Sequence, residues 1–223
     1  MFIRNICMFV TNNKSAMSKF FLISFLLIST AIFAQYGSRD SNMIGITIGV
    51  NQFTLNTSDF DAKPGTGFNL GLSMRGNFYN DWDAIYAMQF SENNFKVTTL
   101  NGAFNERDVN FKLSSAQISF QFSYKFIENH LSVEFGPLVQ ISGKAAVDKT
   151  VEDYIVKGTT TTVKELSNFS NFNFYPVVGI TGGVRHVRLN ISYQYGLTNM
   201  LGKVEGDFKG SAGILNGNVI FYF

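Results

Sequence analysis

The strongest candidates for chemistry in this 223-residue chain are charged residues that stand among small polar ones. They are Arg75, Glu134, Arg185 and Arg188. Long intervals separate them, so only the fold can bring them together. A carboxylate among guanidinium groups can bind a small polar ligand in a lumen, or it can form a salt-bridge network that fills one. In a barrel of about eight strands we favour the network, because such a lumen holds side chains or at most one small ligand.

Other kinds of chemistry lack the residues that they need. The two histidines, His130 and His186, fall in expected short turns with no partners nearby in sequence for a metal or acid–base role. The sequence contains no Gly-rich phosphate loop, nucleophile elbow or zinc-ligand pair. We therefore predict no catalytic, cofactor-binding or metal-binding residue and no cofactor.

Eight runs of alternating apolar and polar residues must position the charged residues. Alternation with a period of two is typical of β-strands. In the clearest run, Phe120 and Phe122 alternate with Gln121 and Ser123. The runs cover residues 44–51, 68–78, 84–91, 116–126, 131–142, 172–185, 187–197 and 215–223.

The connections between these runs alternate strictly between long and short. The long ones are residues 56–66, 92–108, 143–170 and 198–211, and the short ones are 80–83, 128–130 and 185–186. Outer-membrane barrels have short periplasmic turns and long external loops. We therefore predict an all-β fold, a closed up-and-down antiparallel barrel of about eight transmembrane strands. Because the strand count is even, both ends of the barrel chain are expected on the periplasmic side.

The composition of the two strand faces favours a membrane. Charged residues make up only 15% of the chain, against about 25% in a typical soluble domain. The polar face carries Gly, Ser, Asn, Thr and Gln rather than the Lys and Glu of a water-facing sheet. Tyr79, Trp82, Tyr124 and the final Tyr222-Phe223 pair predict an aromatic girdle at the periplasmic rim. A soluble periplasmic ligand-binding barrel, with the two faces reversed, is the alternative.

The N-terminus has the pattern of a secretory leader. Lys19 precedes an apolar run from Phe20 to Phe33, and the small Ala34 stands before a polar residue. We predict a signal peptide over residues 1–34, with Met17 as an alternative start, and an outer-membrane barrel domain over residues 35–223. The excess of basic over acidic residues lies in this leader, so no nucleic-acid partner is expected.

The last strand, residues 217–223, places Val219, Phe221 and a terminal Phe223 on one face. It resembles the C-terminal sorting strand of outer-membrane barrels, which implies that the barrel-assembly machinery reads it. With its Phe-Ala-Gln leader junction, the mature chain resembles the PorT-like family of small outer-membrane β-barrels over nearly all of residues 36–223. The resemblance implies the outer membrane of a Gram-negative bacterium and, for some members, association with protein secretion. It transfers no functional residue.

The segment 143–170 is too long for an idle loop by ordinary loop lengths. Residues 151–156 and 159–163, on either side of Lys157-Gly158, predict a hairpin that rises beyond the membrane. A protein partner could extend such a hairpin by β-augmentation, and a plain strand extension without a partner is the alternative.

These patterns predict a non-enzymatic barrel with a structural or interaction role, surrounded by outer-membrane lipid. An accessory part in protein secretion or envelope organisation is the role expected of it. An outer-membrane barrel enzyme that acts on lipid or peptide is an alternative of a different class. That enzyme would need a polar catalytic cluster near the external rim, whereas both histidines are predicted at the opposite end.

Overall fold

The computed structural model describes residues 42–103, 105–127 and 130–223, so the predicted signal peptide lies outside the described residues. The strands are β1 (Met43–Thr57), β2 (Ala62–Tyr79), β3 (Trp82–Leu100), β4 (Glu106–Ile127), β5 (Leu131–Ser142), β6 (Ile155–Val156), β7 (Phe172–Gly183), β8 (Val187–Tyr195) and β9 (Gly210–Tyr222). Two short helical turns, η1 (Lys149–Val151) and α2 (Val163–Leu166), flank β6. In the part of the chain that is described, no helix is long and apolar enough to cross a membrane.

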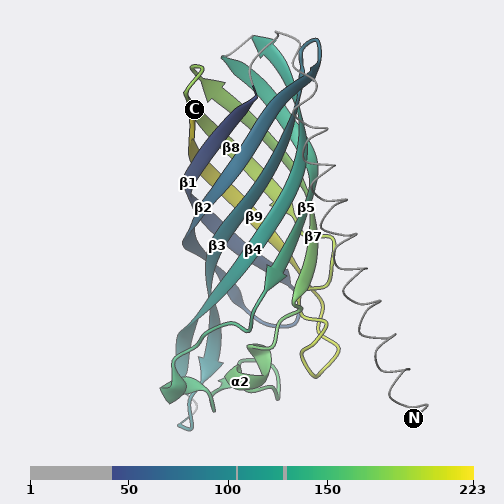
Figure 1. The fold of residues 1–223 in the computed structure, drawn as a ribbon. Coiled ribbons are helices and arrows are strands. Elements are labelled where there is room, and N and C mark those ends of the chain that lie inside the picture. Colours follow the sequence, from purple (N-terminus) through teal and green to yellow (C-terminus); the bar gives the residue numbers. More distant parts are fainter. Residues whose placement is uncertain (1–41, 104, 128–129) are drawn as a thin grey trace, which may run out of the picture. The chain divides into compact units, whose positions relative to one another are not determined.

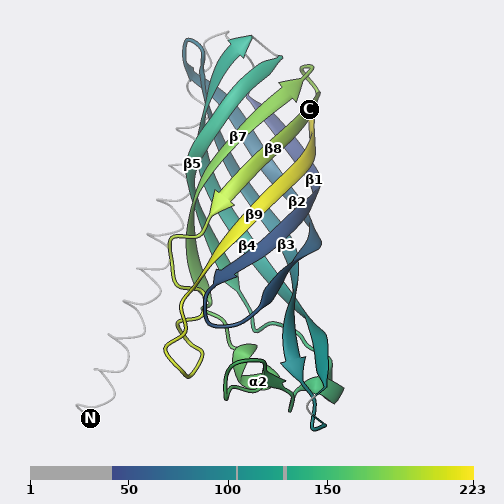
Figure 2. The same ribbon diagram turned by 180° about the vertical axis from the view of Figure 1, so that it is seen from behind.

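Eight of these strands close into a ring, as the alternating runs predicted (Figures 1 and 2). Each ring strand pairs antiparallel with its neighbour in sequence, with β7 following β5, and β9 returns to pair with β1. The closing ladder runs from Gly45↔Tyr222 to Thr57↔Gly210. A closed ring leaves no open strand edge, which is what lipid requires of a β-structure. The short β6 lies outside the ring and pairs with the far end of β3.

The two ends of the barrel differ. At one end, the short-turn end, β2–β3, β4–β5 and β7–β8 are joined by tight connections, and the C-terminus lies there too (Figure 1). Asn80 adopts a positive φ of 45° in the first of these turns, a conformation that Asn tolerates better than most residues. The opposite, long-loop end carries residues 143–170 with α2, and residues 196–209. The three predicted short turns therefore lie together at one end, and the predicted long loops 143–170 and 198–211 lie at the other.

A belt of exposed apolar side chains surrounds the ring. Mid-strand residues such as Ile191 (65% exposed) and Leu72 (59% exposed) point away from the lumen. The same face carries Ile44, Ile46, Ile48, Val50, Phe68, Leu70, Met88, Phe90, Ile118, Phe120, Ile141, Phe172, Val178, Ile180, Leu189, Leu215 and Phe221. The polar side chains of these strands are buried inside. This arrangement contradicts the soluble alternative, which needs the opposite assignment of faces.

The two faces exchange character toward the long-loop end. On the outside of β3, apolar Phe90 is followed by Glu92 and Lys96, while on the inside polar Asn93 is followed by buried Phe95. The neighbouring β4 changes at nearly the same level, because buried Leu113 faces Asn93 and buried Phe111 faces Phe95. The wall therefore continues past the apolar belt with a polar exterior and an apolar interior, as in a water-soluble β-domain.

This exchange overturns two of the predicted loops. Residues 92–108 are almost entirely strand, because β3 runs to Leu100 and β4 begins at Glu106. Part of residues 56–66 is also strand, since β2 begins at Ala62. Both stretches were predicted as loops because the apolar outer face stops there, although the alternation itself continues on the opposite face.

The girdle of aromatic residues at the short-turn end is confirmed in part. Tyr79 is exposed, and the rings of Trp82 and Tyr124 lie with their centroids 5.0 Å apart. Phe223 is also exposed, but Tyr222 turns into the lumen and is buried. Successive residues of β9 point alternately outward and inward, so Tyr222 faces the lumen because it directly follows the outward-facing Phe221.

The apolar belt gives a direct test of which face meets lipid. Ile48→Arg, near the middle of the belt on β1, is expected to lower the free energy of unfolding in lipid vesicles by roughly 2–4 kcal/mol. Asn56→Arg lies on the same face of β1 beyond the belt and is expected to change it little. Urea titration of the refolded barrels measures both. Equal losses in the two variants would contradict the face assignment.

Candidate functional site

The lumen at the short-turn end holds a buried ionic cluster, which we call the ionic layer. Arg75 is its centre: Nε donates to Asp83 Oδ2 at 2.7 Å, and Nη1 donates to Glu134 Oε1 at 3.2 Å. The Nη2 of Arg75 donates to the hydroxyls of Ser123 and Ser132 at 2.5 and 3.2 Å. Arg75 is only 1% exposed, so nearly all of its hydration has been replaced by these four contacts.

A second cation completes the ionic layer. Lys125 Nζ lies 3.3 Å from Asp83 Oδ1, and both side chains are nearly inaccessible to solvent. Asp83 therefore bridges two cations with its two oxygens. Residues that face each other across the lumen thus hold the walls of β2, β3, β4 and β5 together, since each strand contributes one charged group.

Of the four predicted site residues, the structure brings together three in the lumen. Arg75 contacts Glu134, and Arg188 is buried nearby with its guanidinium carbon 5.6 Å from the centre of the Tyr222 ring. Arg188 Nε has no hydrogen-bond partner among the described residues. Arg185, in contrast, lies exposed in the turn between β7 and β8.

The inclusion of Arg185 in the lumenal set is therefore corrected. Alternation was extended through residue 185, but β7 ends at Gly183, where φ is 151° and the chain leaves the pleat. Sequence reasoning also missed Asp83, which was assigned to a turn. The signal was available, because Asp83 shares the parity of the inward-facing Ile85 and Ala87.

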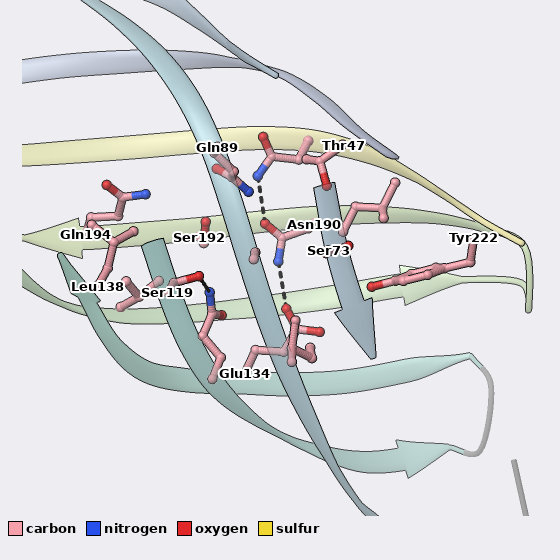
Figure 3. A pocket seen from close by; sticks show the side chains of 16 residues that line it. Thr47, Ser73, Gln89, Ser119, Glu134, Leu138, Asn190, Ser192, Gln194 and Tyr222 are labelled. Carbon is pink, nitrogen blue, oxygen red and sulfur yellow. Dashed lines mark hydrogen bonds between the residues drawn. The ribbon is translucent and has the colours of Figure 1, made fainter. Parts of the chain in front are cut away.

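A layer of amides and hydroxyls, the amide layer, adjoins the ionic layer at Glu134, and Figure 3 shows several of its side chains. Asn190 links the two, donating to Glu134 Oε2 at 3.1 Å and to Thr181 Oγ1 at 2.9 Å. Asn218 donates in turn to Asn190 Oδ1 at 3.0 Å. Further along, Gln117 donates to Gln140 at 3.1 Å. Such a connected network satisfies many of the polar groups that the strands bury in the lumen.

The space left inside this layer is small. A cavity of about 40 Å³ lies among Thr47, Ser119, Glu134 and Tyr222 (Figure 3). That volume holds roughly one to three water molecules and is far below the ~300 Å³ of a small-molecule site. The described lumen is therefore packed with side chains, which favours a structural network over a lumenal ligand site.

At the long-loop end the lumen is filled by apolar side chains, here called the apolar plug. Phe95 and Phe111 stack with their centroids 5.2 Å apart, and Phe169 meets Phe95 edge-on at 5.5 Å. The cluster also includes Phe53, Leu55, Val97, Val109, Leu113, Val163, Leu166, Tyr175, Met200, Leu201 and Ile214. Strand residues and loop residues thus share one core, so the loops at this end are anchored to the barrel.

Residues 143–170, which we call the cap, contribute several of these side chains. The predicted hairpin in this segment is confirmed only as a short one: Ile155 and Thr162 form an antiparallel bridge across the turn at residues 157–160. Residues 151–154 are not strand, β6 pairs with Thr99 and Leu100 of β3, and the chain continues into the single turn of α2. The cap also joins β4, because Lys112 and Ala146 exchange two backbone hydrogen bonds of 3.0 and 2.8 Å. The apolar residues Val156 and Val163, predicted as strand faces, are buried in the plug.

Local hydrogen bonds fix the start of α2. The backbone N–H and the hydroxyl of Thr162 donate to Glu165 Oε2 at 2.8 and 2.9 Å, and the Glu165 N–H donates back to the same hydroxyl. This is a capping box. The two bonds to the carboxylate hold the pKa of Glu165 below its ordinary value. The N–H and hydroxyl of Thr150 lower the pKa of Asp148 in the same way.

Both histidines lie at the short-turn end, as predicted. Nδ1 of His130 is 3.0 Å from the carbonyl oxygen of Gly183, and Nδ1 of His186 is 3.0 Å from that of Tyr222. Each ring therefore fastens a turn to a neighbouring strand end. Among the described residues, no group of three or more His, Cys, Asp or Glu side chains gathers as a metal site.

The predicted sorting strand forms the closing strand of the ring. Phe221 and Phe223 are exposed on the outside of β9, and Val219 shares their face. These are the side chains that a partner would meet on the lipid side of that strand. Their recognition by the barrel-assembly machinery stays a prediction.

Comparisons with known proteins find similarity to solved structures only. No protein-family profile and no curated protein sequence matches the chain. Solved structures do: Neisserial surface protein A has a TM-score of 0.49 at 15% identity, covering 81% of this chain and 97% of that one. Ail of Yersinia pestis, solved with the heparin analogue sucrose octasulfate, has a TM-score of 0.49 at 14% identity, covering 82% and 100%. OprG of Pseudomonas aeruginosa has a TM-score of 0.45 at 10% identity, covering 83% and 97%.

The closed ring and its apolar belt are those of an outer-membrane barrel. This conclusion follows from the chain's own surface, because a continuous belt of exposed Ile, Leu, Val and Phe side chains needs lipid around it. The identities and TM-scores of the similar structures are too low to assign this chain their activities, and the PorT-like resemblance is not matched by a family profile.

The ionic layer predicts a strongly non-additive mutational effect. Arg75→Met is expected to cost about 3–5 kcal/mol of unfolding free energy, because it leaves the Glu134 carboxylate buried without its cation. The double variant Arg75→Met/Glu134→Leu is expected to recover part of that loss, since Asp83 keeps Lys125. Urea unfolding in vesicles measures both. A double variant less stable than Arg75→Met would argue against the pairing.

The capping box predicts a pH dependence confined to the cap. Because the folded-state pKa of Glu165 is lowered, its contribution is present above the unfolded carboxyl pKa of about 4.3 and is lost as pH falls through the lowered value. Hydrogen exchange of residues 162–166, corrected for intrinsic rates, should show protection falling below about pH 4. Glu165→Gln should lack that step. Matching profiles in the two proteins would show that another group controls the cap.

Proposed function

We propose that this chain is a sealed barrel of the outer membrane of a Gram-negative bacterium that works through protein contacts made by its cap. The observation that carries the proposal is the apolar plug. It is built from side chains of the strands and of the cap, and it closes the end of the lumen that lies outside the cell if the short turns are periplasmic. A barrel closed by packed Phe, Val and Leu side chains does not serve diffusion of polar solutes, so its activity is expected at its surfaces.

The construction of the cap supports an interaction role. A loop with no function needs neither a capping box nor a strand paired to the barrel, yet residues 143–170 contain both. The buried Val163, Leu166 and Phe169 hold this segment in one conformation. A surface ordered before binding loses less conformational entropy when a partner docks.

An accessory role in protein secretion or envelope organisation fits such a surface. It is also the role that the PorT-like resemblance implies for some members of that family. The enzyme alternative finds less support, because it needs a catalytic cluster near the external rim, and both histidines lie at the short-turn end bonded to backbone carbonyls. Lipid of the outer membrane surrounds the belt, and the assembly machinery is the expected partner during insertion.

The experiment that tests this function separates the barrel from its cap. In the native bacterium, the gene is deleted and replaced by wild type, by Phe169→Asp or by Asn56→Asp. Phe169 is 1% exposed and touches Phe95 in the plug, so Asp there is expected to release the cap while the ring still closes. Asn56→Asp adds the same charge at an exposed position outside the cap.

Export of secreted proteins and resistance to detergents are then measured, with heat-dependent gel mobility as the check that each barrel folds. We expect the deletion and Phe169→Asp to lose the phenotype equally and Asn56→Asp to keep it. Normal export and envelope resistance in the deletion strain would refute the proposed role. A fully active Phe169→Asp barrel would show that the cap is not its working surface.

A further inference from the structure

A groove on the outside of the barrel lies immediately beyond the apolar belt, on the long-loop side of β1 to β4. It has a volume of about 360 Å³, within the size range of small-molecule sites. Apart from Pro64 and Gly65, the residues that line it have polar side chains: Gln52, Thr66, Asn94, Lys96 and Asn110. These are outward-facing residues, so the groove opens to the surroundings of the barrel and not to the lumen.

A β-bulge builds this groove. The register of β2 against β3 shifts between Pro64 and Phe68, and the backbone there runs very close to β3. A Cβ atom on Gly65 would lie 2.3 Å from the carbonyl oxygen of Asn94, and one on Gly67 would lie 1.8 Å from that of Glu92. Both positions therefore need glycine. Bulges of this kind re-aim side chains, and here the result is a hollow in an otherwise regular wall.

Asn94, Lys96 and Asn110 line the groove, and Lys112 lies beside it on the same outward face. Lys96 pairs across the strands with Asn110, and Asn94 pairs with Lys112. All four face outward, so Lys96 and Lys112 occupy one diagonal of this pair of strand positions and Asn94 and Asn110 occupy the other. Neither lysine forms an ion pair with a described residue, whereas the neighbouring Lys63 is neutralised by Asp108 at 2.7 Å.

The amide of Asn94 adds a hydrogen-bonding element. Its Nδ2 donates to the carbonyl oxygen of Thr66 at 2.8 Å and to Glu92 Oε1 at 3.4 Å, which fixes the orientation of the side chain. Its Oδ1 is buried and has no partner among the described residues. The side chain of Asn94 is therefore held in place by its Nδ2 where it lines the groove.

We propose that this groove binds the phosphorylated sugar headgroup of a glycolipid in the outer leaflet, the lipid A type. The inference rests on the proposed orientation, which places the long-loop end outside. Acyl chains of such a lipid would lie against Val50, Phe68 and Phe90, at the border of the belt nearest the long-loop end. The headgroup would then stand at the level of the groove, with its phosphate at Lys96 and Lys112 and its sugar against Asn94 and Asn110.

The test uses the purified full chain in mild detergent with four probes: bis-phosphorylated lipid A, its monophosphoryl form, phosphatidylglycerol and inorganic phosphate. Native mass spectrometry measures the bound species. Wild type is expected to hold bis-phosphorylated lipid A more tightly than monophosphoryl lipid A and phosphatidylglycerol. K96Q/K112Q is expected to bind lipid A at least about tenfold more weakly. The matched control K149Q/K164Q removes two exposed cap lysines and is expected to bind like wild type.

A second variant, Asn94→Ala/Asn110→Ala, separates sugar recognition from charge. It should reduce the preference for lipid A over phosphatidylglycerol while leaving phosphatidylglycerol binding unchanged. The proposal is overturned if both lysine pairs weaken binding equally, if phosphatidylglycerol binds as tightly as lipid A, or if inorganic phosphate displaces the lipid.

Heat-dependent gel mobility confirms that each variant is folded before it is scored. Binding in detergent does not depend on the cap's partner, so loss of the secretion phenotype and loss of lipid binding can be told apart.

Discussion

Lipid around the wall is the constraint on which the rest of this structure depends. In a bilayer core no water satisfies backbone groups, so β9 must return to β1 and every strand must find two neighbours. In the closed ring, successive residues of each strand point alternately outward to the lipid and inward to the lumen. Once Ile, Leu and Phe occupy the outside, the alternate residues are forced into a narrow lumen. The charged and amide groups there have to satisfy one another, which is why Arg75 has four side-chain partners.

The lumen changes character along its length because its surroundings do. Within the apolar belt, the exterior is apolar and the interior carries the ionic and amide layers. Beyond the belt the exterior meets water, so the same strands bury Phe95 and Phe111 instead. That apolar interior cannot be left open to water, and the cap supplies Val163, Leu166 and Phe169 to cover it. The cap is therefore part of the fold's core, and its outer surface is presented on a rigid base.

Sequence alone predicted the ring, the strand order and the face assignment, because alternation with a lipid-facing partner is a strong signal over whole strands. The prediction failed where the apolar residues move from the outward face of the strands to the inward face. The parts of β3 and β4 nearest the long-loop end keep their period of two, but Phe95 and Phe111 lie on the inward face. The outward face is polar there, so the stretch was predicted as a polar loop. The partnership of Arg75 with Glu134 was predicted, whereas Asp83 was missed and Arg185 wrongly included. Both errors arose at strand ends. There, moving the boundary between strand and turn by one or two residues changes whether a side chain belongs to the alternating strand at all.

The exchange of faces also explains why a polar groove lies where it does. In the outer part of β3 and β4, each residue that enters the apolar plug is followed by one that faces outward. Phe95 and Val97 thus alternate with Asn94 and Lys96, and Phe111 alternates with Asn110 and Lys112. A single sequence pattern therefore seals the lumen and lines the outside of the barrel with amides and cations. The close approach of Gly65 and Gly67 to the backbone of β3 accounts for the hollow in that polar wall. Because the pattern begins at the border of the apolar belt, the hollow is held at the level where lipid headgroups stand.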